Sequence, residues 1–157
     1  MNKFLYILFA LIGFGPMVIA QNTVTITDDD LEGGQTYNWT NNNTYILDGL
    51  VFLEEGGTLN IEEGTVIKGA SAVTTGDNTS ALIITKGAQI FAEGTATEPI
   101  IFTAEADDPS NPDDVPNPQE ARGLWGGLIL LGDATIARPG GEDGIEGIDA
   151  DEPRARF

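Results

Sequence analysis

The sequence contains no cysteine and no histidine, and these two absences exclude much of the chemistry on which enzyme sites commonly rest. Without cysteine the chain has no disulfides, no thiolate metal ligands and no thiol nucleophile. Without histidine it lacks the side chain that most often acts as a general base. No nucleophile–base pair of the usual kind is therefore available. Because the chain has no disulfides, the fold must rest on its hydrophobic core and backbone hydrogen bonds.

Positively charged side chains are also scarce: 7 lysines and arginines stand against 25 aspartates and glutamates, which gives a formal charge of −18. Such a surface repels the phosphate backbone of nucleic acids and anionic lipid head groups. Nucleic acid is therefore not an expected partner. The length of 157 residues and the hydrophobic fraction of 41% fit one domain with a sizeable core.

Residues 1–20 have the pattern of a signal peptide. Lys3 supplies a positive charge, residues 4–14 are apolar, and Pro16 breaks the apolar stretch before Ala20. Cleavage after Ala20 would leave Gln21 as the mature N-terminus. The alternative is a membrane anchor, but the stretch is at the short limit for crossing a bilayer. We predict that the protein is secreted or held on the outer cell surface, with no stable membrane insertion after cleavage.

The middle of the chain contains a repeat. Residues 51–65 and 82–95 both read as a β-rich run, a glycine corner, a second run and another glycine corner. Gly56 aligns with Gly87 at an offset of 31, and Gly64 aligns with Gly94 at an offset of 30 if one residue is deleted. Strands and glycine corners at this period are typical of a solenoid. We therefore predict an all-β fold, an incomplete right-handed parallel β-helix of two to three coils.

This pattern divides the chain into three parts. Residues 1–20 are the signal peptide, 21–43 an N-terminal capping region, and 44–157 a partial β-helix with loop insertions at 70–80, 104–122 and 138–153. Leu128–Leu130 occupies the position of Leu82–Ile84 one coil later. Because no cap follows, we expect this chain to be the N-terminal fragment of a longer protein.

The hydrophobic pattern also predicts which side chains are buried. Residues 58–61 alternate, as a strand with one face in water does, whereas 50–53, 82–84 and 100–102 are continuously apolar and indicate that their outer faces are covered too. One continuous core is expected to contain five side chains: Leu59, Ile61, Ile83, Ile90 and Ile101.

Three blocks of sequence, residues 49–69, 98–104 and 122–132, together resemble a group of secreted right-handed parallel β-helix proteins of Bacteroidota type. Members of this group are often cargo of the type IX secretion system and carry a C-terminal sorting domain, which we expect to lie beyond residue 157 if this protein has one. The resemblance implies an exported β-helix. It supplies no catalytic residues.

The residues themselves offer few candidates for a site. The acids near strands are expected at solvated corners, although Glu93 aligns with Glu62 or Glu63 and the pair could stack on adjacent coils. These acids are Glu54, Glu55, Glu62, Glu63 and Glu93. Lys68, Lys86 and Arg122 are the basic candidates. We predict no catalytic residues in these coils.

Acidic loops suggest calcium as a ligand, because hard oxygen donors suit this ion. The candidate calcium ligands are Asp107, Asp108, Asp113 and Asp114, although they have neither the D-x-D-x-D-G spacing nor a nonapeptide repeat. A second acidic run comprises Glu142, Asp143, Glu146, Asp149 and Asp151. Trp39 and Trp125 raise the possibility of sugar stacking, but packing on the coils is the expected role of both.

Two functions remain open. The first is a non-catalytic extracellular or cell-surface scaffold for adhesion or surface interaction, with a carbohydrate or a cell-surface protein as partner. The alternative is a polysaccharide-active enzyme, a lyase or hydrolase, whose active site lies in coils beyond residue 157.

Overall fold

The computed structural model describes residues 21–111, 113–114 and 121–157, so the predicted signal peptide lies outside the described residues. The regular elements of the described chain are almost all β-strands, joined by turns and loops. Its ten strands are β1 (Asn22–Ile26), β2 (Thr36–Trp39), β3 (Asn43–Leu47), β4 (Leu50–Leu53), β5 (Thr58–Ile61), β6 (Val66–Gly69), β7 (Ala81–Ile84), β8 (Gln89–Ala92), β9 (Ile101–Ala104) and β10 (Gly127–Leu130). Two short 3-10 helices, η1 (Asp28–Asp30) and η2 (Pro153–Ala155), complete the elements.

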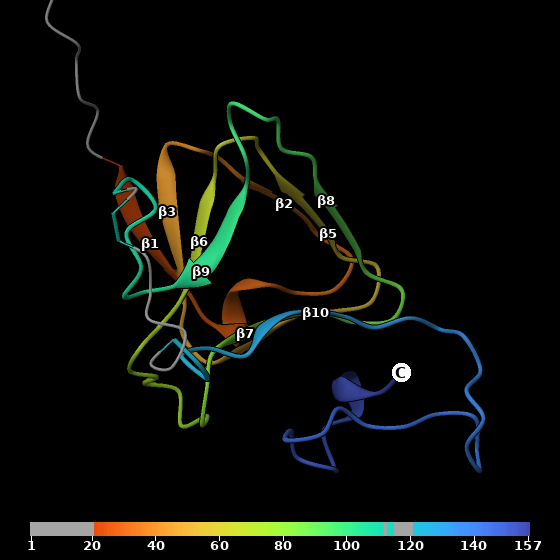
Figure 1. Cartoon of the computed structure of the whole chain (residues 1–157). Helices are drawn as coiled ribbons and strands as arrows, with labels where there is room; N and C mark the ends of the chain where they lie inside the picture. The colour runs from red at the N-terminus through yellow and green to blue at the C-terminus, as the bar shows by residue number, and fades with distance from the viewer. Residues whose placement is uncertain (1–20, 112, 115–120) are drawn as a thin grey trace, which may run out of the picture.

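The strands form three parallel sheets that make the three sides of a solenoid (Figure 1). Their orders are β1-β3-β6-β9, β10-β7-β4 and β2-β5-β8. Every pair of neighbouring strands is parallel and belongs to successive coils, which is the arrangement of a parallel β-helix. The predicted fold, an incomplete right-handed parallel β-helix, is confirmed.

The repeat found in the sequence is the stacking of the coils. Thr58 pairs with Gln89 and Val51 with Leu82, both at the predicted offset of 31. Leu128 pairs with Leu82, as expected for the next coil. Gly56 and Gly87 occupy the same corner in successive coils, with φ angles of 77° and 78° that L side chains rarely adopt.

One part of the predicted alignment is wrong. Gly64 does not stack on Gly94; its N–H donates to the carbonyl oxygen of Glu98 at 3.0 Å. The turn before β6 has four residues and the turn before β9 has eight, so the second copy contains an insertion rather than a deletion. Val66 consequently pairs with Ile101. The two glycines also differ in conformation, since Gly64 has a φ of 78° and Gly94 is not among the glycines with positive φ.

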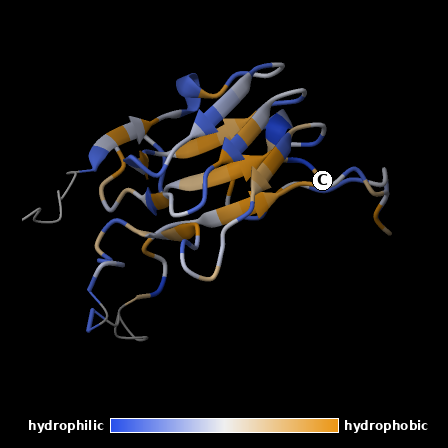
Figure 2. Cartoon of the chain, turned by 90° about the horizontal axis from the view of Figure 1, so that it is seen from above, coloured by the Kyte–Doolittle hydropathy of each residue, from blue (hydrophilic) through white to orange (hydrophobic). Residues whose placement is uncertain are grey.

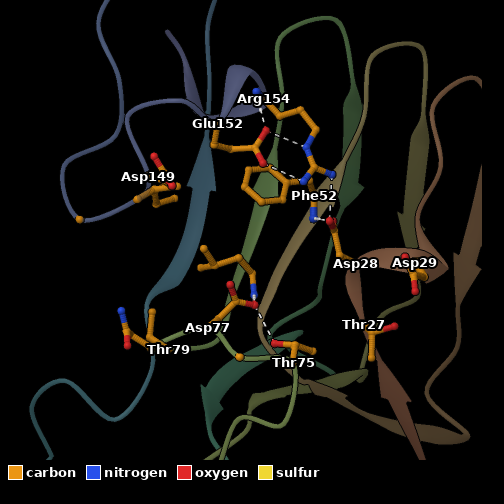
Figure 3. A pocket seen from close by; sticks show the side chains of 15 residues that line it. Thr27, Asp28, Asp29, Phe52, Thr75, Asp77, Thr79, Asp149, Glu152 and Arg154 are labelled. Carbon is orange, nitrogen blue, oxygen red and sulfur yellow. Dashed lines mark hydrogen bonds and ion pairs between the residues drawn. The ribbon is translucent and has the colours of Figure 1, made fainter.

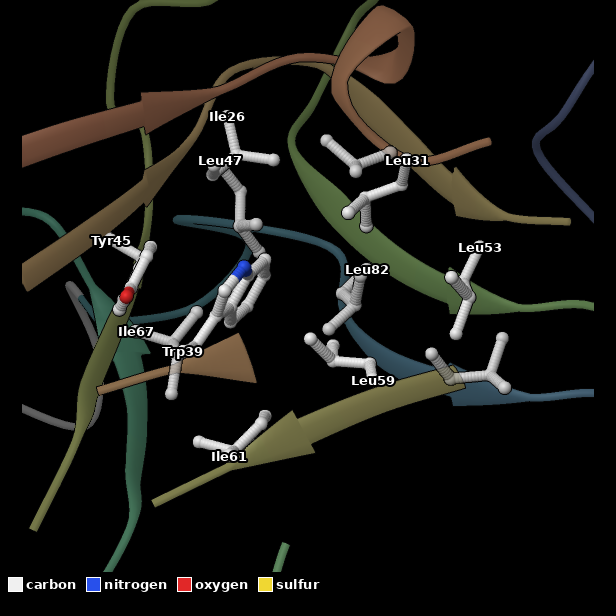
Figure 4. Packing of buried hydrophobic residues seen from close by; sticks show 12 residues of the cluster. Ile26, Leu31, Trp39, Tyr45, Leu47, Leu53, Leu59, Ile61, Ile67 and Leu82 are labelled. Atoms are coloured by element: carbon white, nitrogen blue, oxygen red, sulfur yellow. The ribbon is translucent and has the colours of Figure 1, made fainter. Parts of the chain in front are cut away.

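The main core fills the interior of the solenoid (Figure 4). Strands β1 to β9 contribute alternate residues, and Leu47, Leu53, Leu59 and Leu82 are fully buried there. The hydrophobic strands enclosing this interior are also visible from above (Figure 2). Trp39 lies within the core and stacks on Tyr45, with ring centroids 4.6 Å apart and planes at 15°. Burial of these ladders is the main stabilising contribution to the fold.

A second hydrophobic cluster lies outside the solenoid, on the outer face of the β4-β7-β10 sheet. The C-terminal segment, residues 138–157, folds back over this face (Figure 1). Its Ile145, Ile148 and Ala155 pack against Phe52 and the other outward side chains of the sheet. We refer to this surface as the covered face. It confirms the expectation that the apolar runs of β4 and β7 are covered on both sides.

Two residues predicted for the single core lie elsewhere. Ile83 is fully buried, but it belongs to the cluster on the covered face, while Leu82 and Ile84 point inward. Ile101 is half-buried on the outer side of β9, and its neighbours Ile100 and Phe102 pack on the core. Leu59, Ile61 and Ile90 do face the core. In a strand that is apolar on both faces, the pattern does not reveal which alternate residues point inward.

Residues 21–43 stack on the first full coil. β1 pairs with β3, β2 pairs with β5, and η1 contacts β4. The limits given above for the capping region and the inserted loops stay predictions.

Candidate functional site

A pocket of about 480 Å³ lies on the covered face, between η1, residues 75–79 and the C-terminal segment (Figure 3). Leu50 and Phe52 of β4 form its apolar part. Its polar lining is mainly acidic, and Arg154 is the one basic residue of that lining. The acids are Asp28, Asp29, Asp77, Asp149 and Glu152.

Arg154 connects the C-terminal segment to the N-terminal coil. Its Nε and Nη2 donate to the two carboxylate oxygens of Glu152, both at 2.9 Å. Its Nη1 donates to Asp28 at 2.9 Å and to Glu54 at 3.1 Å. The guanidinium also lies 4.2 Å from the centre of the Phe52 ring, within the range of a cation–π interaction. Arg154 therefore acts as a clamp between parts of the chain that are 126 residues apart.

Two of the acids accept hydrogen bonds from backbone N–H groups at the edge of β4. This strand is the last of its sheet, so alternate N–H groups along one side have no strand partner. The N–H of Phe52 donates to Asp28 Oδ1 and the N–H of Leu50 donates to Asp77 Oδ2, both at 3.0 Å. Asp77 also accepts a hydrogen bond from Thr75 at 2.7 Å. These carboxylates replace the neighbouring strand that β4 lacks.

The electrostatics of the pocket are those of a stable ion pair. The hydrogen bond from Arg154 lowers the pKa of Glu152, and the bond to Glu152 raises the pKa of Arg154. Both groups are therefore charged at neutral pH. A general acid needs the opposite shift, a carboxyl pKa raised toward neutrality, so Glu152 is unsuited to that role.

The five acids predicted near strands all lie in turns. Glu54 and Glu55 follow β4, Glu62 and Glu63 follow β5, and Glu93 follows β8. The corner positions expected from the sequence are therefore confirmed. Glu54 accepts from Arg154, and Glu62 accepts the backbone N–H of Asn41 at 3.0 Å.

The pairing register identifies the partner of Glu93. Ile61 pairs with Ala92, so Glu62 and Glu93 are equivalent positions on adjacent coils. Glu62, Glu63 and Glu93 line a shallow hollow beside Phe91.

The predicted basic residues are dispersed. Lys68 lies within β6 and donates to the carbonyl oxygen of Asp107 at 2.6 Å. Lys86 lies in the turn after β7 and pairs with Glu142 at 2.6 Å. Arg122 lies in the segment between β9 and β10.

Both tryptophans pack on the core rather than present their rings to a ligand. Trp39 is 4% exposed, and Trp125 packs against the same hydrophobic cluster while half-buried. The expected packing role is confirmed for both.

The candidate calcium ligands lie in a loop that uses its side chains for local hydrogen bonds. Asp107 accepts from Thr103 at 2.7 Å, and Asp108 accepts from the hydroxyl of Ser110 at 2.7 Å. Asp114 accepts the N–H of Asp108 at 2.8 Å, and the N–H of Asp113 donates to Asn111. The hydrogen bonds from Ser110 lower the pKa of Asp108.

Within the described ranges no three acidic side chains come together as a metal-binding group. Calcium binding by this loop stays a prediction. The same part of the chain holds no helix long and apolar enough to cross a membrane.

Sequence reasoning missed Arg154, which bonds to Asp28, Glu54 and Glu152 beside the pocket. A single arginine in an acidic, glycine-rich segment carries no local pattern that names its partners. The one available signal was the continuously apolar β4, which required a cover from elsewhere in the chain.

Comparison with known proteins adds one finding. The family model described as "Pectate-lyase like beta helix domain" matches residues 32–150. No curated protein and no solved structure matches the chain.

Proposed function

The chain belongs to the pectate-lyase-like β-helix domain family, and within that family we propose that it is a non-catalytic extracellular scaffold that mediates adhesion or surface interaction. The family's fold occurs in scaffolds and in polysaccharide enzymes alike, so the choice between these functions rests on the residues. A carbohydrate or a cell-surface protein is the partner in this proposal.

One observation carries the proposal: three of the five acids that line the pocket on the covered face already have structural partners. Asp28 and Asp77 saturate the edge of β4, and Glu152 is paired with Arg154 on both carboxylate oxygens. A glycosidase needs two free carboxyl groups on either side of the scissile bond. Committing these groups to the fold removes them from that role.

We further propose that the protein acts outside the cell. The signal-like residues 1–20 support export, as does the formal charge of −18, which favours solubility in an exposed setting. The resemblance to Bacteroidota-type β-helix proteins, which are often cargo of the type IX system, also supports export. A mature N-terminus at Gln21, found by mass spectrometry of protein from the culture medium or cell surface, would support this proposal; retention of residues 1–20 would contradict it.

The rival function is a polysaccharide lyase or hydrolase, and within this chain the observation that favours it is the stacking of Glu62 and Glu93 on adjacent coils. The test is incubation of the purified protein with polygalacturonate, xylan and mannan, followed by assay for new reducing ends and unsaturated products. We expect no release above a buffer control. Release that disappears in Glu93→Gln but persists in the matched variant Glu55→Gln would overturn the scaffold proposal.

A further inference from the structure

We propose that the outer face of the β2-β5-β8 sheet binds a neutral glycan, with Phe91 as the stacking platform. This inference rests on the proposed scaffold function and names its ligand class. We refer to this surface as the open face. It differs in position and in chemistry from the pocket on the covered face.

The open face presents two ladders of outward side chains. The first ladder is formed by Thr36, Thr58 and Gln89, and the second by Asn38, Asn60 and Phe91. Asn60 donates from its amide nitrogen to the amide oxygen of Asn38 at 2.9 Å, which orders the second ladder. Neighbouring strands lie about 4.8 Å apart and alternate residues about 7 Å apart along a strand. The result is a flat polar surface with one aromatic ring at its end.

Phe91 is the most unusual residue of this surface. It is 50% exposed, although full burial of a phenylalanine stabilises a protein by about 1.5–3 kcal/mol. Its position alternates with Ile90, which packs on the core, so the pleat of β8 directs Phe91 outward. The hollow beside it, about 470 Å³, is also lined by Asn60, Glu62 and Glu93.

These groups match the two surfaces of a pyranose ring. The axial C–H groups of a sugar ring form an apolar face that stacks on an aromatic side chain, and its hydroxyl groups need donors and acceptors around the edge. Phe91 supplies the apolar platform. Asn60 and Gln89 supply amide donors and acceptors, and Glu62 and Glu93 supply acceptors for hydroxyl protons.

The charge of the site decides between glycan classes. Glu62, Glu63 and Glu93 surround Phe91 in a chain with a formal charge of −18. A polyuronate or a sulfated glycan would be repelled by these carboxylates, and no basic side chain lines the hollow in the described part of the chain. A neutral chain of hexose or pentose units incurs no such repulsion. The open face is therefore assigned to a neutral glycan.

The test uses four soluble probes: cellohexaose, mannohexaose, xylohexaose and polygalacturonate. Binding to the full chain is measured by calorimetry, and secondary structure and melting temperature are recorded for each variant. We expect at least one neutral probe to bind and polygalacturonate not to bind. Phe91→Ala should weaken binding of that probe about tenfold or more, and Phe91→Trp should retain or strengthen it.

Leu124→Ala is the matched control, because Leu124 is similarly exposed, at 42%, but lies outside the hollow. This variant should bind as the parent chain does. Three outcomes would overturn the inference: no neutral probe binds, Phe91→Ala binds as tightly as the parent, or polygalacturonate binds more tightly than the neutral probes. Association of the chain with itself that is lost in Phe91→Ala, without any glycan binding, would also overturn it in favour of a self-contact.

The two proposals fail in different ways. Absence of glycan binding would contradict the claim that the open face binds a neutral glycan, but it would not contradict the scaffold function. Shortening of a bound neutral probe, seen as new reducing ends in the calorimetry sample, would instead remove the claim that the scaffold is non-catalytic while keeping Phe91 as the binding platform.

Discussion

The covered face and the open face arise from the same coils but have opposite chemistry. On the covered face, the outward residues Phe52 and Ile83 are apolar and are packed under the C-terminal segment. On the open face, the outward residues are mostly threonine, asparagine and glutamine, with Phe91 exposed among them. The inward residues of both sheets belong to one core. The coil repeat thus determines the interior, while the outward residues decide whether a sheet is buried or offered to a partner.

The largest expected effect is on the covered face. Ile83→Ala should lower the free energy of unfolding by about 2–5 kcal/mol, as for a residue of the main core, because Ile83 is fully buried under the C-terminal segment. Asn60→Ala, at an outward position of the open face, should change it by about 0.5 kcal/mol or less. Urea unfolding followed by circular dichroism measures both values. Equal losses would show that the two faces do not differ as the packing indicates.

The next effect concerns the edge of β4. Asp28→Ala removes the acceptor of the Phe52 N–H and a partner of Arg154, and should lower the free energy of unfolding by about 1–3 kcal/mol. Asp29→Ala is the control, since it removes one charge from the same pocket without removing either bond. Urea unfolding of the two variants, compared at the same ionic strength, checks this prediction. A loss in Asp29→Ala as large as that in Asp28→Ala would mean that charge alone is responsible.

A smaller effect is expected from the clamp itself. Arg154→Ala should cost about 1–2 kcal/mol, because its ion pairs are partly exposed and its contact with Phe52 is a single cation–π pair. Arg154→Lys should recover only part of this loss, since an ammonium group cannot bind both oxygens of Glu152 in the same way. Hydrogen exchange at the Ile145 amide, which is bonded to Ala155, reports on the C-terminal segment. Unchanged protection in Arg154→Ala would exclude a clamping role.

Acidification should loosen the covered face before the open face. Arg154 holds the pKa of Glu152 below its ordinary value of 4.5, so the pair stabilises the folded state above that pH. As the pH falls below 4.5 and through the lowered pKa, Glu152 becomes protonated and this contribution is lost. Hydrogen exchange between pH 6 and pH 3, corrected for intrinsic rates, should therefore show earlier loss of protection at Ile145 than at Leu59. Simultaneous loss at both amides would contradict the prediction.

The weakest effect is expected at the end of the solenoid, where inward-pointing residues lack a cover. Leu128 and Leu130 of β10 continue the inward ladder of Leu82 and Ile84, yet they are 37% and 62% exposed. We expect weak self-association that increases with salt, since charge repulsion is screened beyond about 10 Å at 0.1 M. Sedimentation velocity at low and high salt measures it, and Leu130→Asp should reduce it. A monomer at both salt concentrations would contradict the expectation.

Some elements could be predicted because their residues carry a local pattern. Thr58–Ile61 alternates strictly, so its inward side chains were identified correctly. Leu82–Ile84 is apolar at every position, and the inward assignment of Ile83 was wrong for that reason. The length of the turn before β9 was predicted wrongly, because Gly94 was aligned with Gly64 although the two glycines do not stack. Arg154 had no pattern at all, since each of its contacts outside its own turn joins residues at least 100 positions away.

The sequence by itself determined the β-helix, the offset of 31 from β4 and β5 to the strands stacked on them, and the corners at Gly56 and Gly87, because these depend on alternation and on backbone conformations that glycine favours. It also determined that β4 and β7 need a cover, because apolar residues on both faces of a strand cannot remain in water without cost. Only the tertiary structure decided which segment covers these strands and which contacts hold that segment in place. Contacts between Arg154, Asp28 and Phe52 depend on how distant segments meet after folding, and no periodicity in the chain encodes that meeting.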